Sequence, residues 1–128
     1  MSQQSRFELG MAQLKAIDGE AGESVYLRLF EIYPALADLM IEFPFGSVYS
    51  RDELDLKSRE IATVAALTAM GSCLAQLKVH IQAALNVGCS MIEINEVILQ
   101  MSVYAGFPAA LNGLFCAQEV YQEKGLLE

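Results

Sequence analysis

The stretch Ser90–Lys124, SMIEINEVILQMSVYAGFPAALNGLFCAQEVYQEK, decides the fold class. It opens with Ser90 and Glu93 in the S-x-x-E order of a capping box, in which each side chain bonds an exposed amide of the first helical turn. Apolar residues then recur every three or four positions and predict a helix that ends near Gly106, after which Pro108 begins a final helix. The same spacing runs through most of the chain, and no alternating β-branched run predicts a sheet. The sequence therefore predicts an all-α fold.

Residues 97–118 within that stretch carry no charge and are long enough to span a bilayer. Three polar residues, Gln100, Ser102 and Asn112, interrupt the segment. The sequence Gly106-Phe107-Pro108 ends one helix and starts the next. We therefore expect two buried helices and no membrane partner.

The beginning of the chain predicts two more helical regions. Apolar residues share one face over residues 7–17, and Gly19 and Gly22 are expected to end this first helix. A second region covers residues 24–43, with a new turn or a kink at Pro34, because the proline ring cannot donate the helical hydrogen bond.

The middle of the chain predicts a loop followed by a helical hairpin. Residues 43–54, FPFGSVYSRDEL, have no helical period and predict an ordered aromatic loop. Asp55 then offers an N-cap for a helix that runs to about Met70. A shorter helix over residues 73–87 is expected to close on Gly88.

Size and composition indicate a folded protein that associates with itself. The 128 residues, 14.0 kDa, suit a single domain over residues 1–128. Apolar residues make up 54% and charged residues 19%, and the mean hydropathy is +0.34, which excludes disorder of the whole chain. So few charges leave apolar surface once the core is filled, and we expect a homo-oligomer.

Net charge and cysteine content limit the classes of binding partner and the cellular compartment that we expect. Eight Lys and Arg against sixteen Asp and Glu give a net charge of −8, which repels nucleic acid and anionic lipid. The three cysteines include no CxxC pair and leave one unpaired in any intramolecular scheme, as suits a reducing compartment. Residues 1–7 lack the order of a signal peptide. We expect a cytoplasmic protein.

His80 and Glu60 are the strongest candidates for catalytic residues. His80 is the only histidine, and its spacing with Leu77, Ile81 and Ala84 places it on the buried face of its helix. It is either a core histidine bonded to a backbone carbonyl or a general acid or base, since imidazole titrates near neutral pH. Glu60, on the preceding helix, either orients His80 or is an exposed acid near a helix N-terminus.

Metal and thiol chemistry have weaker support. Zinc takes three or four His, Cys or carboxylate ligands at regular spacing, and one histidine does not supply them, so we expect no metal. Cys73 precedes a helix, where the positive end of the dipole favours a thiolate, but free cysteines are also among the most frequently buried residues.

Residues 43–71, 76–88 and 94–114 resemble, in this order, the carboxymuconolactone decarboxylase family. The specific blocks are H-I-x-x-A-L-N-x-G, which begins at His80, and V-Y-A-G-F-P-A-A-L-N, which contains Tyr104. The resemblance implies N-terminal helices over residues 1–42 and a family core over residues 43–124. It also implies an all-helical fold of the alkyl hydroperoxidase D-like type, with about six to seven helices.

The resemblance further implies a ring-like homo-oligomer, usually a hexamer built as a trimer of dimers, and an activity without a cofactor. That activity is the decarboxylation of a carboxylated lactone, a small molecule from aromatic-compound degradation. On this basis His80 donates to the developing oxyanion or delivers a proton, with Glu60 setting its tautomer. Arg51 is expected to bind a substrate carboxylate or else to pair with an acidic neighbour on the surface.

The remaining substrate-binding candidates are Tyr49 and Tyr104, as hydroxyl donors, and Cys73. An apolar pocket from Ile61, Val64 and Ile81 is expected to favour loss of the carboxylate charge.

Two other functions compete with the decarboxylase. The related alkyl hydroperoxidase D branch reduces peroxides with a glutamate, a CxxC pair and a histidine. Cys73 matches the first cysteine of that motif, but Gln76 stands at the second and Glu60 is one residue out of register, so a thiol-dependent peroxidase or disulfide reductase would have to use Cys73 alone. The third possibility is a non-enzymatic oligomeric binding protein.

Overall fold

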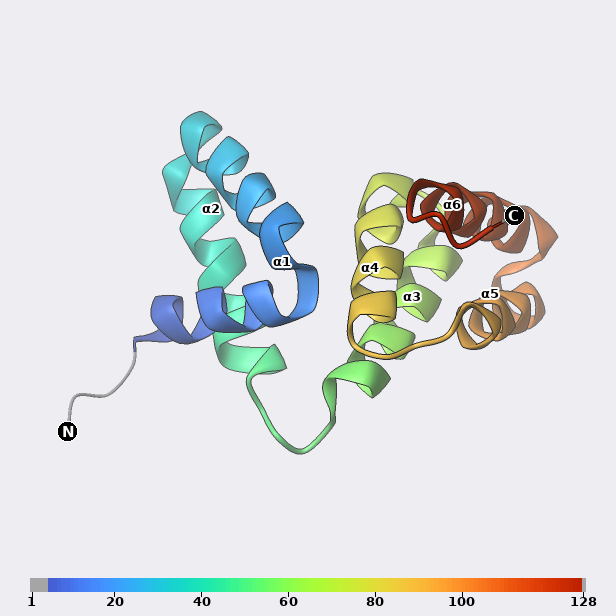
Figure 1. Ribbon diagram of the computed structural model, residues 1–128, viewed down its shortest axis with the longest axis horizontal. Coiled ribbons are helices and arrows are strands. Elements are labelled where there is room, and N and C mark those ends of the chain that lie inside the picture. Colours follow the sequence, from blue (N-terminus) through green and yellow to red (C-terminus); the bar gives the residue numbers. More distant parts are fainter. Residues whose placement is uncertain (1–4, 128) are drawn as a thin grey trace. The chain divides into compact units, whose positions relative to one another are not determined.

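The computed structural model describes residues 5–127, which form six α-helices and one π-helix and contain no strand (Figure 1). The elements in chain order are α1 (Arg6–Ile32), α2 (Pro34–Met40), η1 (Ile41–Tyr49), α3 (Leu56–Met70), α4 (Leu74–Asn86), α5 (Met91–Ala105) and α6 (Phe107–Glu123). This confirms the predicted all-α fold. The chain divides into two compact units, residues 1–56 and 57–128.

The first unit begins with a kinked helix. Within α1, Gly19 has a φ of 58° and a ψ of −142°, so the chain leaves helical geometry there and then resumes it. The predicted stop at Gly19 is therefore confirmed as a kink. The predicted stop at Gly22 is wrong, because Gly22 lies buried inside the second half of the helix, where its missing Cβ makes room for Asp18 and Leu14. Pro34 begins α2, as the proline ring favours at a first helical position.

The loop predicted over residues 43–54 is wrong for its first half. Ile41–Tyr49 forms the π-helix η1, which contains Pro44. A wider turn accommodates a proline ring that clashes with the preceding turn of an α-helix. Two backbone contacts with α1 hold η1: a Cβ on Gly10 would lie 2.2 Å from the Ile41 carbonyl oxygen, and one on Gly46 would lie 2.4 Å from that of Arg6. Sequence spacing does not reveal such contacts.

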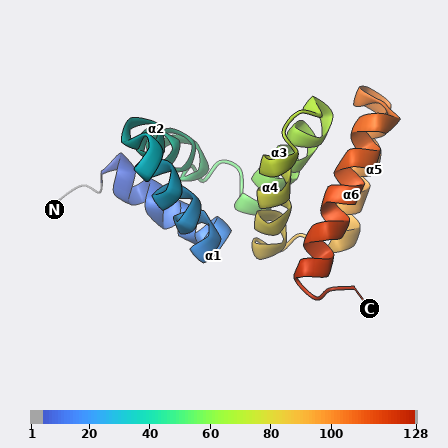
Figure 2. The same ribbon diagram turned by 90° about the horizontal axis from the view of Figure 1, so that it is seen from above.

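The second unit holds four helices around one apolar core. Val64, Leu77, Ile81, Ile94 and Ile98 are among its fully enclosed side chains. Helices α5 and α6 run alongside each other (Figure 2), and Gly113 of α6 lets that helix approach the threonine at position 68 of α3. The helix starts predicted after residues 55, 73 and 90 are confirmed within one residue.

The capping box at the start of α5 is confirmed. Ser90 Oγ accepts from the Glu93 amide at 3.0 Å, and Glu93 Oε1 accepts from the Ser90 amide at 2.9 Å. This bonding and the nearby Lys57 lower the pKa of the Glu93 carboxyl. The break between α5 and α6 falls at Gly106, where φ is 91°. The uncharged stretch of residues 97–118 is therefore two helices, and no described helix is long and apolar enough to cross a bilayer.

The prediction of a single domain, with a division at residue 42 or 43, stays a prediction. By compactness, the boundary between the two units falls after residue 56. Residues 1–4 and 128 lie outside the described residues. They form part of the predicted domain, and residues 1–4 are part of the segment for which we expect no signal peptide.

Candidate active site

The candidate active site is a buried contact between α3 and α4. A hydrogen bond of 2.9 Å joins His80 Nδ1 and Glu60 Oε2. The Glu60 side chain is 0% exposed, whereas 20% of the His80 side chain reaches solvent. The alternative of an exposed, dipole-stabilising Glu60 is therefore wrong, and the only histidine of the chain has an acidic partner.

Helical spacing places both side chains inward. Glu60, Val64 and Thr68 follow one another at four-residue intervals and form the buried face of α3. His80 lies between Leu77 and Ile81, which are both completely buried on α4. The two inward faces thus bring together residues that are twenty positions apart in the sequence.

Only one of the two carboxyl oxygens of Glu60 has a hydrogen-bond partner among the described residues. Its second oxygen, Oε1, is buried and has no hydrogen-bond partner within residues 5–127. A carboxylate in this position would hold a charge away from water with little compensation, which is unfavourable. In the net-neutral form of the pair, no unbalanced charge lies in the interior.

The net-neutral form gives the other ring nitrogen, Nε2, a defined role. In a net-neutral pair, one proton lies between Nδ1 and Oε2 and a second proton is on Nε2, whichever partner holds the first one. The Nε2 atom is then a donor. Since Glu60 is enclosed and 20% of the His80 side chain is exposed, the imidazole is the member of the pair that is accessible from outside.

The other candidates in the second unit do not share this contact. Cys73 is the N-cap of α4 and is partly buried, with its sulfur 3.8 Å from Ser72 Oγ. Tyr104, near the end of α5, is 78% exposed. Their substrate-binding roles stay predictions.

Two candidates belong to the first unit. Tyr49 ends η1 and stacks on Phe45 with ring centroids 5.3 Å apart. Arg51 forms an ion pair with Glu53 at 3.5 Å, and 59% of the arginine side chain is exposed. Their roles in binding substrate likewise stay predictions.

The expected apolar pocket is not formed by the residues assigned to it. Val64 and Ile81 are 1% and 0% exposed and belong to the packed core, and Ile61 packs against that core. Their helical faces point toward neighbouring side chains, so they do not offer a free wall to a ligand.

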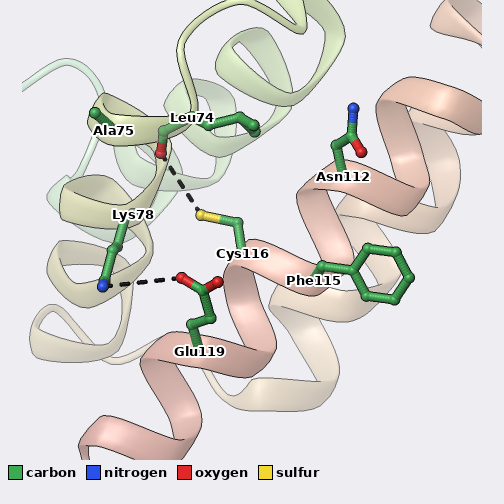
Figure 3. A pocket seen from close by; sticks show the side chains of 7 residues that line it. All are labelled: Leu74, Ala75, Lys78, Asn112, Phe115, Cys116 and Glu119. Carbon is green, nitrogen blue, oxygen red and sulfur yellow. Dashed lines mark hydrogen bonds and ion pairs between the residues drawn. The ribbon is translucent and has the colours of Figure 1, made fainter.

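A depression of about 310 Å³ lies elsewhere, between α4 and α6 (Figure 3). Its lining contains none of the predicted site residues and consists of Leu74, Ala75, Lys78, Asn112, Phe115, Cys116 and Glu119. Lys78 Nζ contacts Glu119 at 3.9 Å and Glu123 at 2.7 Å, so acidic side chains already surround this cation. Helical spacing could have identified the two faces, but not the hollow between them.

All three cysteines are free thiols. Burial raises the pKa of the thiols of Cys89 and Cys116, so both are poor nucleophiles. Across the part of the chain that the structure describes, no group of three His, Cys, Asp or Glu side chains could hold a metal ion.

Comparison with known proteins adds to this geometry. The model of the carboxymuconolactone decarboxylase family matches residues 34–119, which include the whole α3–α4 contact. The chain belongs to this family. A 4-carboxymuconolactone decarboxylase from Acinetobacter baylyi is 30% identical over 127 residues, which cover 98% of this chain and 94% of the relative.

Two further relatives are informative. An uncharacterized 15.0 kDa protein from the nqo9-nqo10 intergenic region of Paracoccus denitrificans is 37% identical over 95 residues, which cover 73% of this chain and 71% of the relative. The nitrosuccinic acid decarboxylase of Metarhizium robertsii is 29% identical over 86 residues, which cover 67% of this chain and 59% of the relative. The family and these decarboxylase relatives support a decarboxylase role.

Proposed function

We propose that the protein decarboxylates 4-carboxymuconolactone, or a close analogue, to the corresponding enol-lactone. The observation that carries this proposal is the 2.9 Å contact between His80 and the fully enclosed Glu60. In this proposal His80 is the catalytic residue that meets the substrate. Glu60 is a positioning residue, because its side chain is out of reach of a ligand.

The substrates named for two relatives share a skeleton that supports this reaction class. In both 4-carboxymuconolactone and nitrosuccinic acid, one carbon carries a carboxylate and a CH₂–carboxylate arm, as in succinate. In the lactone this carbon is attached to a ring double bond that is conjugated with the carbonyl, and in nitrosuccinic acid it bears the nitro group. Each molecule therefore has an acceptor for the electron pair that carbon dioxide leaves behind. We propose that this protein takes a dicarboxylate of that class.

The reaction places three demands on a protein. As the bond to the carboxylate breaks, its electron pair moves through the ring double bond to the carbonyl oxygen of the lactone. The products of this step are a dienolate and carbon dioxide. A donor must stabilise that oxygen, and a proton must reach the carbon next to the carbonyl. A cation is needed for the acetate arm.

The net-neutral pair suits the first two demands. The proton on His80 Nε2 is a donor for the dienolate oxygen and can be delivered to the adjacent carbon. After delivery, the proton between Nδ1 and Oε2 stays on the imidazole and the carboxylate carries the charge. Glu60 thus keeps the ring in the tautomer that leaves Nε2 able to exchange protons.

Arg51 is proposed to bind the acetate arm. Its ion pair with Glu53 is exposed, and such pairs contribute only about 0–1 kcal/mol, so Glu53 holds the guanidinium weakly. Tyr49, Tyr104 and Cys73 are proposed as further substrate contacts, with the two phenols as hydroxyl donors.

A spectrophotometric assay that generates 4-carboxymuconolactone in situ tests the proposal, with nitrosuccinic acid as a second substrate. Wild type is expected to turn over the lactone, and His80→Gln is expected to be slower by about 10²–10³-fold while remaining folded. Gln76→Ala, an exposed change on the same helix, is the matched control. Near wild-type turnover by His80→Gln would remove His80 from the mechanism.

A hydroperoxide with a dithiol, run in parallel, tests the thiol-dependent alternative. Our proposal predicts no peroxide consumption that depends on Cys73. Peroxide consumption that disappears in Cys73→Ser, together with no lactone turnover, would replace the decarboxylase proposal with a peroxidase.

We also propose that the protein forms a homo-oligomer, and specifically a hexamer. Large apolar side chains on α5 and α6 support self-association, since Val103, Phe107 and Phe115 are 75%, 71% and 64% exposed. Light scattering on the full chain measures the mass directly, and a monomer at micromolar concentration would contradict the proposal.

A further inference from the structure

We infer that the Glu60–His80 pair also catalyses proton exchange at the carbon next to the carbonyl of a β,γ-unsaturated lactone. This inference rests on the proposed function, because it runs the protonation step in reverse. It assigns the site a second activity that involves no loss of carbon dioxide. The substrate class then includes lactones that never carried the leaving carboxylate.

The state of the pair after one turnover is the first argument. Once Nε2 has given its proton to carbon, Nε2 is an acceptor and the proton at Nδ1 remains bonded to Glu60 Oε2 across 2.9 Å. The new C–H bond lies next to that acceptor. Since a catalyst of one direction also catalyses the reverse, the same atom can remove the proton again.

The burial of Glu60 is the second argument. In the net-negative state the charge lies on a carboxylate that is 0% exposed and whose Oε1 has no hydrogen-bond partner among the described residues. A buried charge without a second hydrogen bond is costly, and return of a proton to Nε2 relieves that cost. The bound lactone and water are the two sources, and each uptake from the lactone regenerates the dienolate.

Solvent access to the imidazole is the third argument. The His80 side chain is 20% exposed, so a proton held on the imidazole can exchange with water. Deuterium from heavy water then enters the pair at His80. Glu60 does not need to meet solvent for this exchange.

The exchange balances in atoms and charge. The C–H bond breaks and Nε2 takes the proton. The electron pair of that bond forms a carbon–carbon double bond, and the carbonyl π electrons move to the carbonyl oxygen of the lactone. The proton on Nε2 is replaced by a solvent deuteron. The deuteron then bonds to the same carbon, the carbonyl re-forms, and no group is oxidised or reduced.

The test supplies the β,γ-unsaturated lactone with an acetate arm, prepared without this enzyme, to the full-length protein in heavy water. Mass spectrometry counts the deuterons and proton NMR follows the ring CH₂ signal. Wild type is expected to exchange this carbon at least about 10²-fold faster than His80→Gln, and faster than an equal concentration of free imidazole. Gln76→Ala is expected to match wild type.

Decarboxylation is measured on the same preparations, so the two claims can fail separately. Decarboxylation with wild-type exchange no faster than free imidazole overturns this inference and leaves the proposed function in place. Exchange without decarboxylation supports the inferred proton chemistry and overturns the proposed reaction. The absence of both activities overturns both claims. The comparison with free imidazole keeps the test valid even if His80→Gln is unfolded.

Discussion

The two units of the chain are both helical, yet their interiors are built differently. In the first unit, two glycines allow backbone to contact backbone. Gly10 of α1 lies against η1, and Gly46 of η1 lies against α1. In the second unit, the interior encloses an acid, Glu60, with a single imidazole partner. Buried ionisable pairs add little to stability compared with apolar residues of similar volume. The second unit therefore holds polar groups that its packing does not require, which supports the role that we propose for this pair.

Breaking the polar pair is expected to have the largest effect on stability. His80→Leu removes the described hydrogen-bond partner of Glu60 Oε2 and leaves the buried carboxyl group without one. We expect a loss of about 3–5 kcal/mol in the free energy of unfolding, measured by urea denaturation. His80→Gln is expected to lose less, because an amide can still donate to Glu60.

The double variant Glu60→Leu/His80→Leu is the control for this effect. Replacing both partners with apolar side chains is expected to recover most of the lost stability. A double variant that is less stable than His80→Leu would show that the carboxyl group contributes more than its pairing with the imidazole.

Gly10→Ala tests the contrasting construction of the first unit. The new Cβ would lie 2.2 Å from the Ile41 carbonyl oxygen, and backbone cannot shift as a flexible side chain can. We expect a loss of about 1–3 kcal/mol in the free energy of unfolding, with η1 displaced. Ser24→Ala, an exposed change on the same helix, is the matched control in circular dichroism melts. Unchanged stability of Gly10→Ala would contradict the close packing of α1 against η1.

The same contrast explains what the sequence could predict. In the second unit the helical period alone places Glu60 and His80 on facing inward surfaces, and the S-x-x-E box sets the start of α5. In the first unit the period fails at Pro44, because the π-helix depends on contacts between Gly10, Gly46 and distant backbone. The depression between α4 and α6 was missed for a related reason, since spacing defines a face but not the space between two faces.

Tyr121 is expected to make the stability of the second unit depend on pH above pH 10. Burial raises the pKa of Tyr121 to about 12 from the usual value of 10.0. The phenol therefore ionises in the unfolded chain before it does so in the folded one, and its contribution is complete below pH 10 and lost as the pH rises toward 12. We expect a loss of about 1–2 kcal/mol over this interval. Tyr121→Phe should show a smaller loss in urea titrations, and an equal loss would assign the effect to other groups.

The capping box of α5 is expected to contribute least. Ser90→Ala removes the acceptor for the Glu93 amide and should lower stability by about 1 kcal/mol. The pKa of Glu93 is lowered in the folded state, so its contribution is present at neutral pH and is lost as the pH falls through its titration. Glu93→Gln removes the titrating carboxyl group, so its melting temperature should change less between pH 7 and pH 3 than that of wild type, whereas Ser90→Ala keeps the backbone amide and Lys57 that lower this pKa.

The most direct test of the central claim is a double-mutant cycle on turnover of 4-carboxymuconolactone. The rates of wild type, His80→Gln, Glu60→Gln and the double variant are compared, with KM measured for each. If the two residues handle one proton together, Glu60→Gln lowers kcat without changing KM, and the double variant is no slower than His80→Gln. Additive losses in the double variant, or full activity of His80→Gln, would contradict a shared proton between Glu60 and His80.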